Sequence, residues 1–96
     1  GAIATSCGLQ ILTDAFASLD NRRLDTLLVP GGCVGTRFEV PPALARWVGE
    51  TASAVRRVCS VCTGAFVLAE AGLLAGRRAA THWNWADQLH ERFPEV

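Results

Sequence analysis

The apolar positions of the chain fall into short runs with two different spacings. Residues 25–29 and 57–61 are nearly continuous apolar runs bounded by turn residues, which is typical of buried strands. Between them, Pro41-Pro42 follows a glycine-rich loop and is placed to open a helix. The apolar residues after this pair recur at helical spacing: Leu44, Trp47, Val48 and, at the end of the run, Val55.

The second half of the chain predicts two more helices and one short strand. A helix should run from Thr63 to about Leu74, with Gly72 and Gly76 available to end it. Residues 79–81 read as a short strand, and residues 83–93 as a last helix that Pro94 stops. Toward the amino terminus, a short apolar start leads into a polar turn at 5–8, and Thr13-Asp14 can cap a helical turn through Leu19.

Alternation of strands and helices predicts an α/β fold with a parallel sheet and helices on both faces. The predicted strands number only three or four, whereas sheets of this architecture usually have more. We therefore expect residues 1–96 to form one domain that is truncated at both ends, the middle of a larger unit.

Composition narrows the functional classes. Half of the residues are apolar, yet no run is long enough to span a bilayer and no basic segment precedes an apolar one at the start. We therefore expect a cytoplasmic protein without a membrane partner. Nine basic and nine acidic residues give no net charge, which argues against a nucleic-acid surface within these residues.

The four cysteines, Cys7, Cys33, Cys59 and Cys62, do not form the dense framework of a secreted disulfide scaffold. Cys59 and Cys62 satisfy the C-x-x-C spacing, but Cys59 falls inside the strand, whereas a redox pair needs both sulfurs at the helix start. A zinc site lacks the further ligands it would need. We expect no metal and no cofactor, and we expect the other three cysteines to be core or loop residues.

Cys62 stands out because the Ser60-Val61-Cys62-Thr63-Gly64 segment turns a strand abruptly into a helix. This is the cysteine counterpart of a nucleophile elbow, in which the side chain projects from the end of the sheet. The first amides of the helix should favour the thiolate form. The alternative is a buried, unreactive thiol kept for packing.

The glycine turn after the other strand, Gly31-Gly32, should lie near this cysteine. Parallel strands bring their carboxyl ends to the same edge of a sheet, where ligands bind in a common crevice. Thr81-His82-Trp83 lies about twenty residues downstream of Cys62 and offers an imidazole. His82 could equally cap the last helix.

These segments resemble the ThiJ/PfpI family of class I glutamine amidotransferase-like domains. The similarity rests on Val29-Pro30-Gly31-Gly32, on the run from Ser60 to Leu74, and on Thr81-His82-Trp83. More narrowly, the chain is similar to the amino-terminal sensor domain of AraC-family transcription regulators. The resemblance implies a flavodoxin-like fold. It also implies that Cys62 is the family's elbow cysteine, that His82 lies near it, and that Gly32 and Thr63 supply oxyanion-type amides.

Two functional classes follow from the resemblance. In a sensor, a small-molecule ligand is held by Gly31, Gly32, Cys62, Thr63 and His82 and shifts the geometry of a homodimer. DNA would then be bound only through a helix-turn-helix module outside these residues. In an enzyme of the isocyanide hydratase or glyoxalase-like type, Cys62 is the nucleophile and His82 assists it. Family members bring an acidic residue to the cysteine from a strand without a counterpart here, so we favour the sensor.

Overall fold

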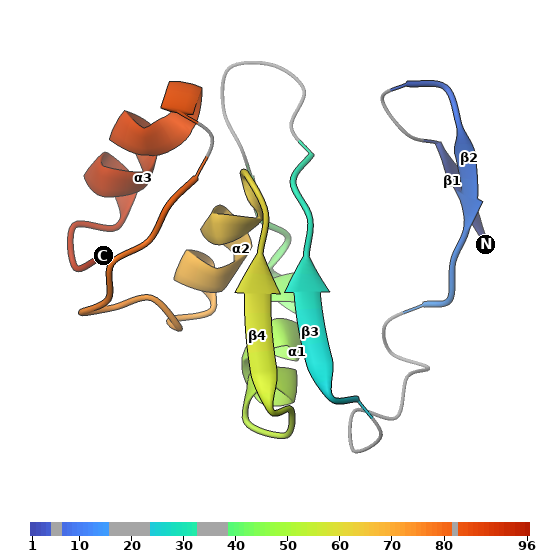
Figure 1. The fold of residues 1–96 in the computed structure, drawn as a ribbon, viewed down its shortest axis with the longest axis horizontal. Coiled ribbons are helices and arrows are strands. Elements are labelled where there is room, and N and C mark those ends of the chain that lie inside the picture. Colours follow the sequence, from blue (N-terminus) through green and yellow to red (C-terminus); the bar gives the residue numbers. More distant parts are fainter. Residues whose placement is uncertain (5–6, 16–23, 33–38, 82) are drawn as a thin grey trace.

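The computed structural model describes residues 1–4, 7–15, 24–32, 39–81 and 83–96 (Figure 1). This part of the chain is mixed α/β, with a two-stranded parallel sheet, a two-stranded antiparallel sheet and helices. The strands are β1 (Ala2–Ala4), β2 (Gln10–Leu12), β3 (Thr26–Val29) and β4 (Arg57–Ser60). The helices are α1 (Pro42–Ala52), α2 (Gly64–Glu70), the 3₁₀ helix η3 (Trp83–Trp85) and α3 (Ala86–Arg92).

The parallel sheet consists of β3 and β4, the two strands that the continuous apolar runs predicted. Their register runs from Thr26 opposite Arg57 to Val29 opposite Ser60. The ladder continues one residue further, because the Val61 amide donates to the Val29 carbonyl at 3.0 Å. In Figure 1 both arrowheads point the same way, so the carboxyl ends of the two strands meet at one edge.

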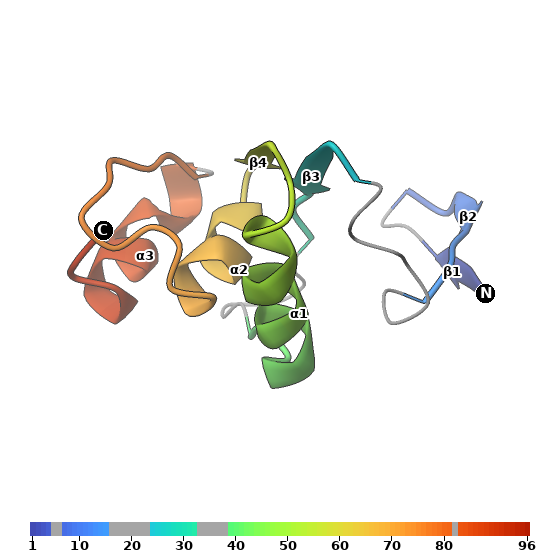
Figure 2. The same ribbon diagram turned by 90° about the horizontal axis from the view of Figure 1, so that it is seen from below.

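Helices α1 and α2 lie on the same side of this sheet (Figure 2). Leu27 and Val29 of β3 point into the core with Val48 of α1 and Val67 of α2. Leu28 points the other way and is 58% exposed, as the two-residue period of a strand requires. We expected helices on both faces, and the helices of the described residues cover one.

Helix α1 begins where Pro41-Pro42 predicted it. Pro42 occupies the first helical position, where a missing amide costs no hydrogen bond. The helix buries Ala45, Val48 and Thr51 and ends at Ala52. Val55 therefore lies beyond the helix, and its side chain packs against the core from the turn that leads into β4.

Helix α2 is the centre of the molecule, since all six residues from Gly64 to Ala69 are buried. A helix that is apolar all round must be covered on all sides, and α2 packs against α1 and the sheet on one side and α3 on the other. It ends earlier than predicted, at Glu70. Gly72, with φ of +79°, supplies the left-handed residue, and the amides of Gly72 and Leu73 donate to the carbonyls of Ala69 and Leu68.

The last predicted helix is present as η3 followed by α3. Leu89 of α3 is buried against Phe66, which is fully buried in α2. The Arg92 guanidinium lies 5.5 Å from the ring centroids of both Phe66 and Phe93. Cation–π contacts of this kind add to the apolar packing that holds α3 on α2.

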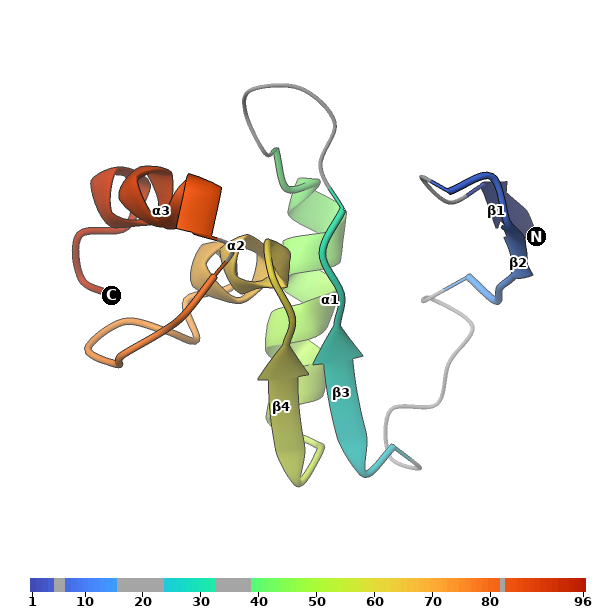
Figure 3. The same ribbon diagram turned by 45° about the horizontal axis from the view of Figure 1, so that its top comes forward.

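Two amino-terminal predictions differ from the structure. The short apolar start belongs to the β1–β2 hairpin, whose ends are joined by hydrogen bonds between Gly1 and Thr13. All six of its strand side chains are exposed, and the hairpin lies apart from β3 (Figure 3). The predicted helical turn from Thr13 to Leu19 is not helical at residues 13–15, and its remainder lies outside the described residues.

The predicted strand at residues 79–81 is also absent. The segment is irregular, and Ala79 and Ala80 are exposed. A strand needs a neighbour with which to exchange hydrogen bonds. Within the part of the chain that the structure describes, β4 pairs only with β3, so residues 79–81 have no ladder to join.

Candidate functional site

Cys62 stands in the turn between β4 and α2. Its φ is +55°, and it is the one residue other than glycine with a positive φ among the described residues. The left-handed region crowds the Cβ of an L-residue and costs roughly 1–3 kcal/mol. The Cys62 side chain is half-buried. The strand-to-helix turn that the sequence predicted is therefore strained at the cysteine itself.

Hydrogen bonds on both sides hold this conformation. Before the turn, the Val61 amide continues the ladder to Val29. After it, the Gly64 amide donates to the Val61 carbonyl at 3.0 Å and the Ala65 amide donates to the Cys62 carbonyl at 3.3 Å. The amides of the first two residues of α2 thus bond to carbonyl oxygens of the turn.

Gly64 allows α2 to start this close to the sheet. A Cβ at this position would overlap the Val29 carbonyl oxygen and lie 3.0 Å from the Pro30 carbonyl oxygen. Both obstacles are backbone atoms, which cannot rotate aside. The small residue after the cysteine is therefore required by the packing of helix on strand.

Gly31 lies against the cysteine turn, as the parallel strand ends predicted. A Cβ on Gly31 would come within 3.0 Å of both the Cys62 Cβ and the Thr63 Oγ1, and within 3.2 Å of the Thr63 amide nitrogen. Gly32 has open space at the same position, and its amide donates to Thr63 Oγ1 at 3.0 Å. The two segments are thus brought together.

The donors at this junction differ in what they can offer a ligand. The Gly32 amide is already bonded to Thr63 Oγ1, and Thr63 as a whole residue is only 2% exposed. The Thr63 amide donates to no acceptor among the described residues. Of the two amides expected as oxyanion-type donors, the one on Thr63 is free in this part of the chain, and the Thr63 hydroxyl supports the Gly32 loop.

Thr81 is a member of the site that the sequence did not single out. Its hydroxyl donates to the Cys62 carbonyl at 2.8 Å, across 19 residues of chain. The Thr81-His82-Trp83 motif drew attention to the histidine, and the threonine beside it was the available signal. His82 itself lies outside the described residues.

Cys59 and Cys7 lie outside the turn around Cys62. Cys59 is a half-buried free thiol inside β4, and Cys7 is exposed in the hairpin turn. Cys33 lies outside the described residues. Across the described ranges, no three histidine, cysteine or acidic side chains gather where they could hold a metal ion.

An ion pair between Arg56 and Asp25 lies at the end of the parallel sheet opposite Cys62. Arg56 donates to Asp25 with bonds of 2.7 and 2.9 Å, and the Thr26 hydroxyl donates to the same carboxylate. The Arg56 bonds, followed by the Thr26 bond, lower the pKa of Asp25, and Asp25 in turn raises the pKa of Arg56. These groups are exposed and fix the start of the β3–β4 pair.

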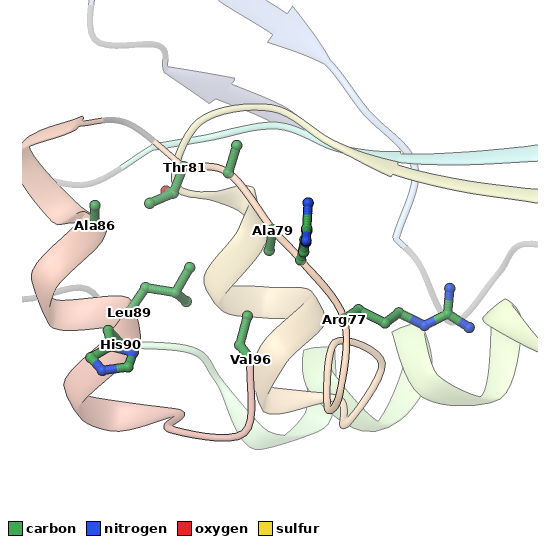
Figure 4. A pocket seen from close by; sticks show the side chains of 9 residues that line it. Arg77, Ala79, Thr81, Ala86, Leu89, His90 and Val96 are labelled. Carbon is green, nitrogen blue, oxygen red and sulfur yellow. The ribbon is translucent and has the colours of Figure 1, made fainter.

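A hollow of about 670 Å³ lies between residues 77–81 and α3. Figure 4 shows Ala79 and Leu89 bordering it from opposite sides, whereas Arg77 extends away. Thr81 belongs to both this hollow and the cysteine turn. The lining residues are Arg77, Arg78, Ala79, Ala80, Thr81, Ala86, Leu89, His90 and Val96.

The comparison with protein families matches residues 1–95 to the model of the DJ-1/PfpI family. The chain belongs to the DJ-1/PfpI family. This family, also called ThiJ/PfpI, has a flavodoxin-like fold, in agreement with the mixed α/β structure and with the resemblance drawn from the Cys62 and Gly31-Gly32 motifs.

Curated relatives of this DJ-1/PfpI chain carry different names. It is 49% identical over 82 residues to an uncharacterized protein in the cpoL 5′ region of Streptomyces lividans, covering 85% of the chain and 56% of the relative. It is 44% identical to the isonitrile hydratase of Pseudomonas putida, covering 91% and 38%. It is 35% identical to the HTH-type transcriptional regulator CdhR of Pseudomonas aeruginosa, covering 100% and 28%.

The chain thus spans from about a quarter to a little over half the length of these relatives. No solved structure matches it. In the described residues, no helix combines the length and the apolar character needed to cross a membrane.

Proposed function

We propose that this DJ-1/PfpI chain is part of the ligand-sensing domain of an AraC-family transcription regulator. A small molecule binds at the carboxyl ends of β3 and β4, where Gly31, Gly32, Cys62 and Thr63 converge. We propose His82 as a further ligand-binding residue. The Thr63 amide and the Cys62 side chain are the groups best placed to contact it. The zero net charge supports a domain that leaves DNA binding to another part of the protein.

One observation carries this proposal. The chain aligns along its whole length with HTH-type transcriptional regulators, including CdhR and, at 31% identity, GlxA of Rhizobium meliloti. In such a regulator the ligand acts by favouring one arrangement of the domain, which the DNA-binding module then reads. We propose a homodimer as the unit that carries this change.

The gene that encodes the chain gives a direct test. A helix-turn-helix coding region in the same reading frame supports the regulator, and a reading frame that lacks one contradicts it. The protein test is a thermal-shift screen with a panel of small metabolites. A ligand at 100 times its Kd stabilises the folded state by about 2.7 kcal/mol, which is easily detected.

Gly31→Ala tests whether the ligand occupies the proposed crevice. Its added methyl group would lie 3.0 Å from both the Cys62 Cβ and the Thr63 Oγ1, so the two segments that border the crevice must shift apart. A ligand that binds there should lose its thermal shift with Gly31→Ala and retain it with Gly49→Ala, a control on α1 where the added Cβ makes only ordinary contacts. Equal shifts in both variants would place the ligand elsewhere.

The second candidate is a cysteine-dependent enzyme, favoured by the 44% identity to an isonitrile hydratase over 91% of the chain. In this case the Cys62 thiol adds to the terminal carbon of an isocyanide, which takes up a proton to give a thioimidate, and the Thr63 amide stabilises the charge that develops. Water then hydrolyses the thioimidate to the N-substituted formamide and returns the thiol. Incubation with an alkyl isocyanide separates the two candidates. The enzyme is supported if the wild type consumes the isocyanide and Cys62→Ser does not. The sensor is supported if the wild type leaves the isocyanide unchanged and the thermal-shift screen finds a ligand.

A further inference from the structure

We propose that Thr81 is a positioning residue of the Cys62 site, whose hydroxyl holds the strained turn in its reactive geometry. This inference deepens the proposed function and rests on it. It assigns a role at the same site to a residue that is not among those proposed to contact the ligand. It starts from the hydrogen bond that joins Thr81 to the Cys62 carbonyl.

The Cys62 carbonyl accepts two hydrogen bonds of unequal quality. The bond from the Ala65 amide is 3.3 Å long, beyond the usual range for an amide donor, and the bond from the Thr81 hydroxyl is 2.8 Å. The direction of this carbonyl is set by the backbone angles around Cys62, where φ is +55°. The hydroxyl therefore acts on the peptide that determines where the sulfur points.

The position of Thr81 in the chain makes this bond a link between two segments. Residues 79–81 join no strand, and in the described part of the chain no other hydrogen bond connects them to the cysteine turn. The Thr81 side chain is half-buried, so water competes less with its hydroxyl than at an exposed site. Thr81 is the first residue of the Thr81-His82-Trp83 motif, so this bond joins the start of that motif to the Cys62 carbonyl.

The test compares Thr81→Val, which keeps the shape but removes the donor, with Thr81→Ser, which keeps the donor. The rate of alkylation by iodoacetamide is measured at Cys62 by mass spectrometry, with Cys59 in the same molecule as reference. Thr26→Val is the matched control, because it removes a threonine hydroxyl bond at the far end of β3.

We expect Thr81→Val to lower the Cys62 rate about two- to twelvefold relative to Cys59, the range that the loss of one hydrogen bond produces. Thr81→Ser should restore the wild-type ratio, and Thr26→Val should leave it unchanged. An unchanged ratio in Thr81→Val overturns the proposal. So does a lowered ratio in Thr81→Ser relative to the wild type, and this comparison does not depend on whether the valine variant folds.

The failure of the proposed function has a different signature. If the ligand gives the same thermal shift in Gly31→Ala as in the wild type while the Thr81 variants behave as expected, the proposed ligand site is wrong and the positioning role stands. If wild-type Cys62 reacts no faster than Cys59, the turn has no special reactivity and the positioning role of Thr81 is overturned, whereas the sensor proposal is still decided by the reading frame and the thermal-shift series.

Discussion

Replacing Gly64 with alanine tests the closeness of α2 to β3, on which the cysteine turn depends. The new Cβ would overlap the Val29 carbonyl oxygen and crowd that of Pro30. Val29 also accepts the ladder bond from the Val61 amide, so neither partner can yield without loss. The helix must shift outward, which disturbs the packing of six buried residues.

The expected destabilisation is about 3 kcal/mol, the upper end of overpacking costs, because the obstacle is backbone rather than a side chain. For 96 residues the entropy of unfolding is about 0.2 kcal/mol/K, so the melting temperature should fall by about 15 °C. Urea denaturation and thermal melting followed by circular dichroism both report this change.

Gly49→Ala is the matched control. A Cβ at Gly49 would meet Ala71 atoms at 3.7 and 3.9 Å, which are ordinary contacts. Alanine is also the better helix former, so this variant should gain up to about 1 kcal/mol. If Gly64→Ala melts within a few degrees of the wild type, the reasoning that places the start of α2 against β3 is refuted.

Two further predictions concern stability alone. The Thr51 hydroxyl is fully buried and has no hydrogen-bond partner among the described residues, so Thr51→Val should stabilise the protein by about 1 kcal/mol. A lower urea midpoint than that of the wild type would contradict this. The Arg56 bonds lower the pKa of Asp25, so the stability from this pair is complete above the ordinary pKa of an aspartate and is lost as the pH falls through the lowered value. Below about pH 4, the urea midpoint of Asp25→Asn should therefore depend less on pH than that of the wild type. If the two midpoints change with pH in parallel, the ion pair does not contribute to stability.

The sequence was sufficient to predict the parallel strands, the cysteine turn and the glycine beside it. Buried parallel strands read as continuous apolar runs, and their ends must meet at one edge, so Gly31 and Cys62 were expected to converge. The geometry at Gly31 shows that they do. Gly72 was one of two glycines expected to end this helix, and it supplies the left-handed residue, although the helix ends at Glu70 rather than near Leu74.

Other features depend on contacts that no local pattern encodes. The β1–β2 hairpin has exposed side chains on both faces, so it lacks the alternation of apolar and polar residues that marks a half-buried strand. Residues 79–81 were expected to form a strand, but they have no strand partner in the described residues. The bond between Thr81 and Cys62 and the engagement of the Gly32 amide by Thr63 both span long stretches of chain, so only the folded structure reveals them.

The central claim is that the β3 and β4 ends form a site around a strained, accessible Cys62. The most direct measurement is the rate of iodoacetamide alkylation at Cys62 and Cys59, resolved by mass spectrometry, in the folded protein and in urea. We predict that Cys62 reacts at least several times faster than Cys59 in the folded protein, and that the two rates converge in urea. Equal rates in the folded protein would contradict the claim.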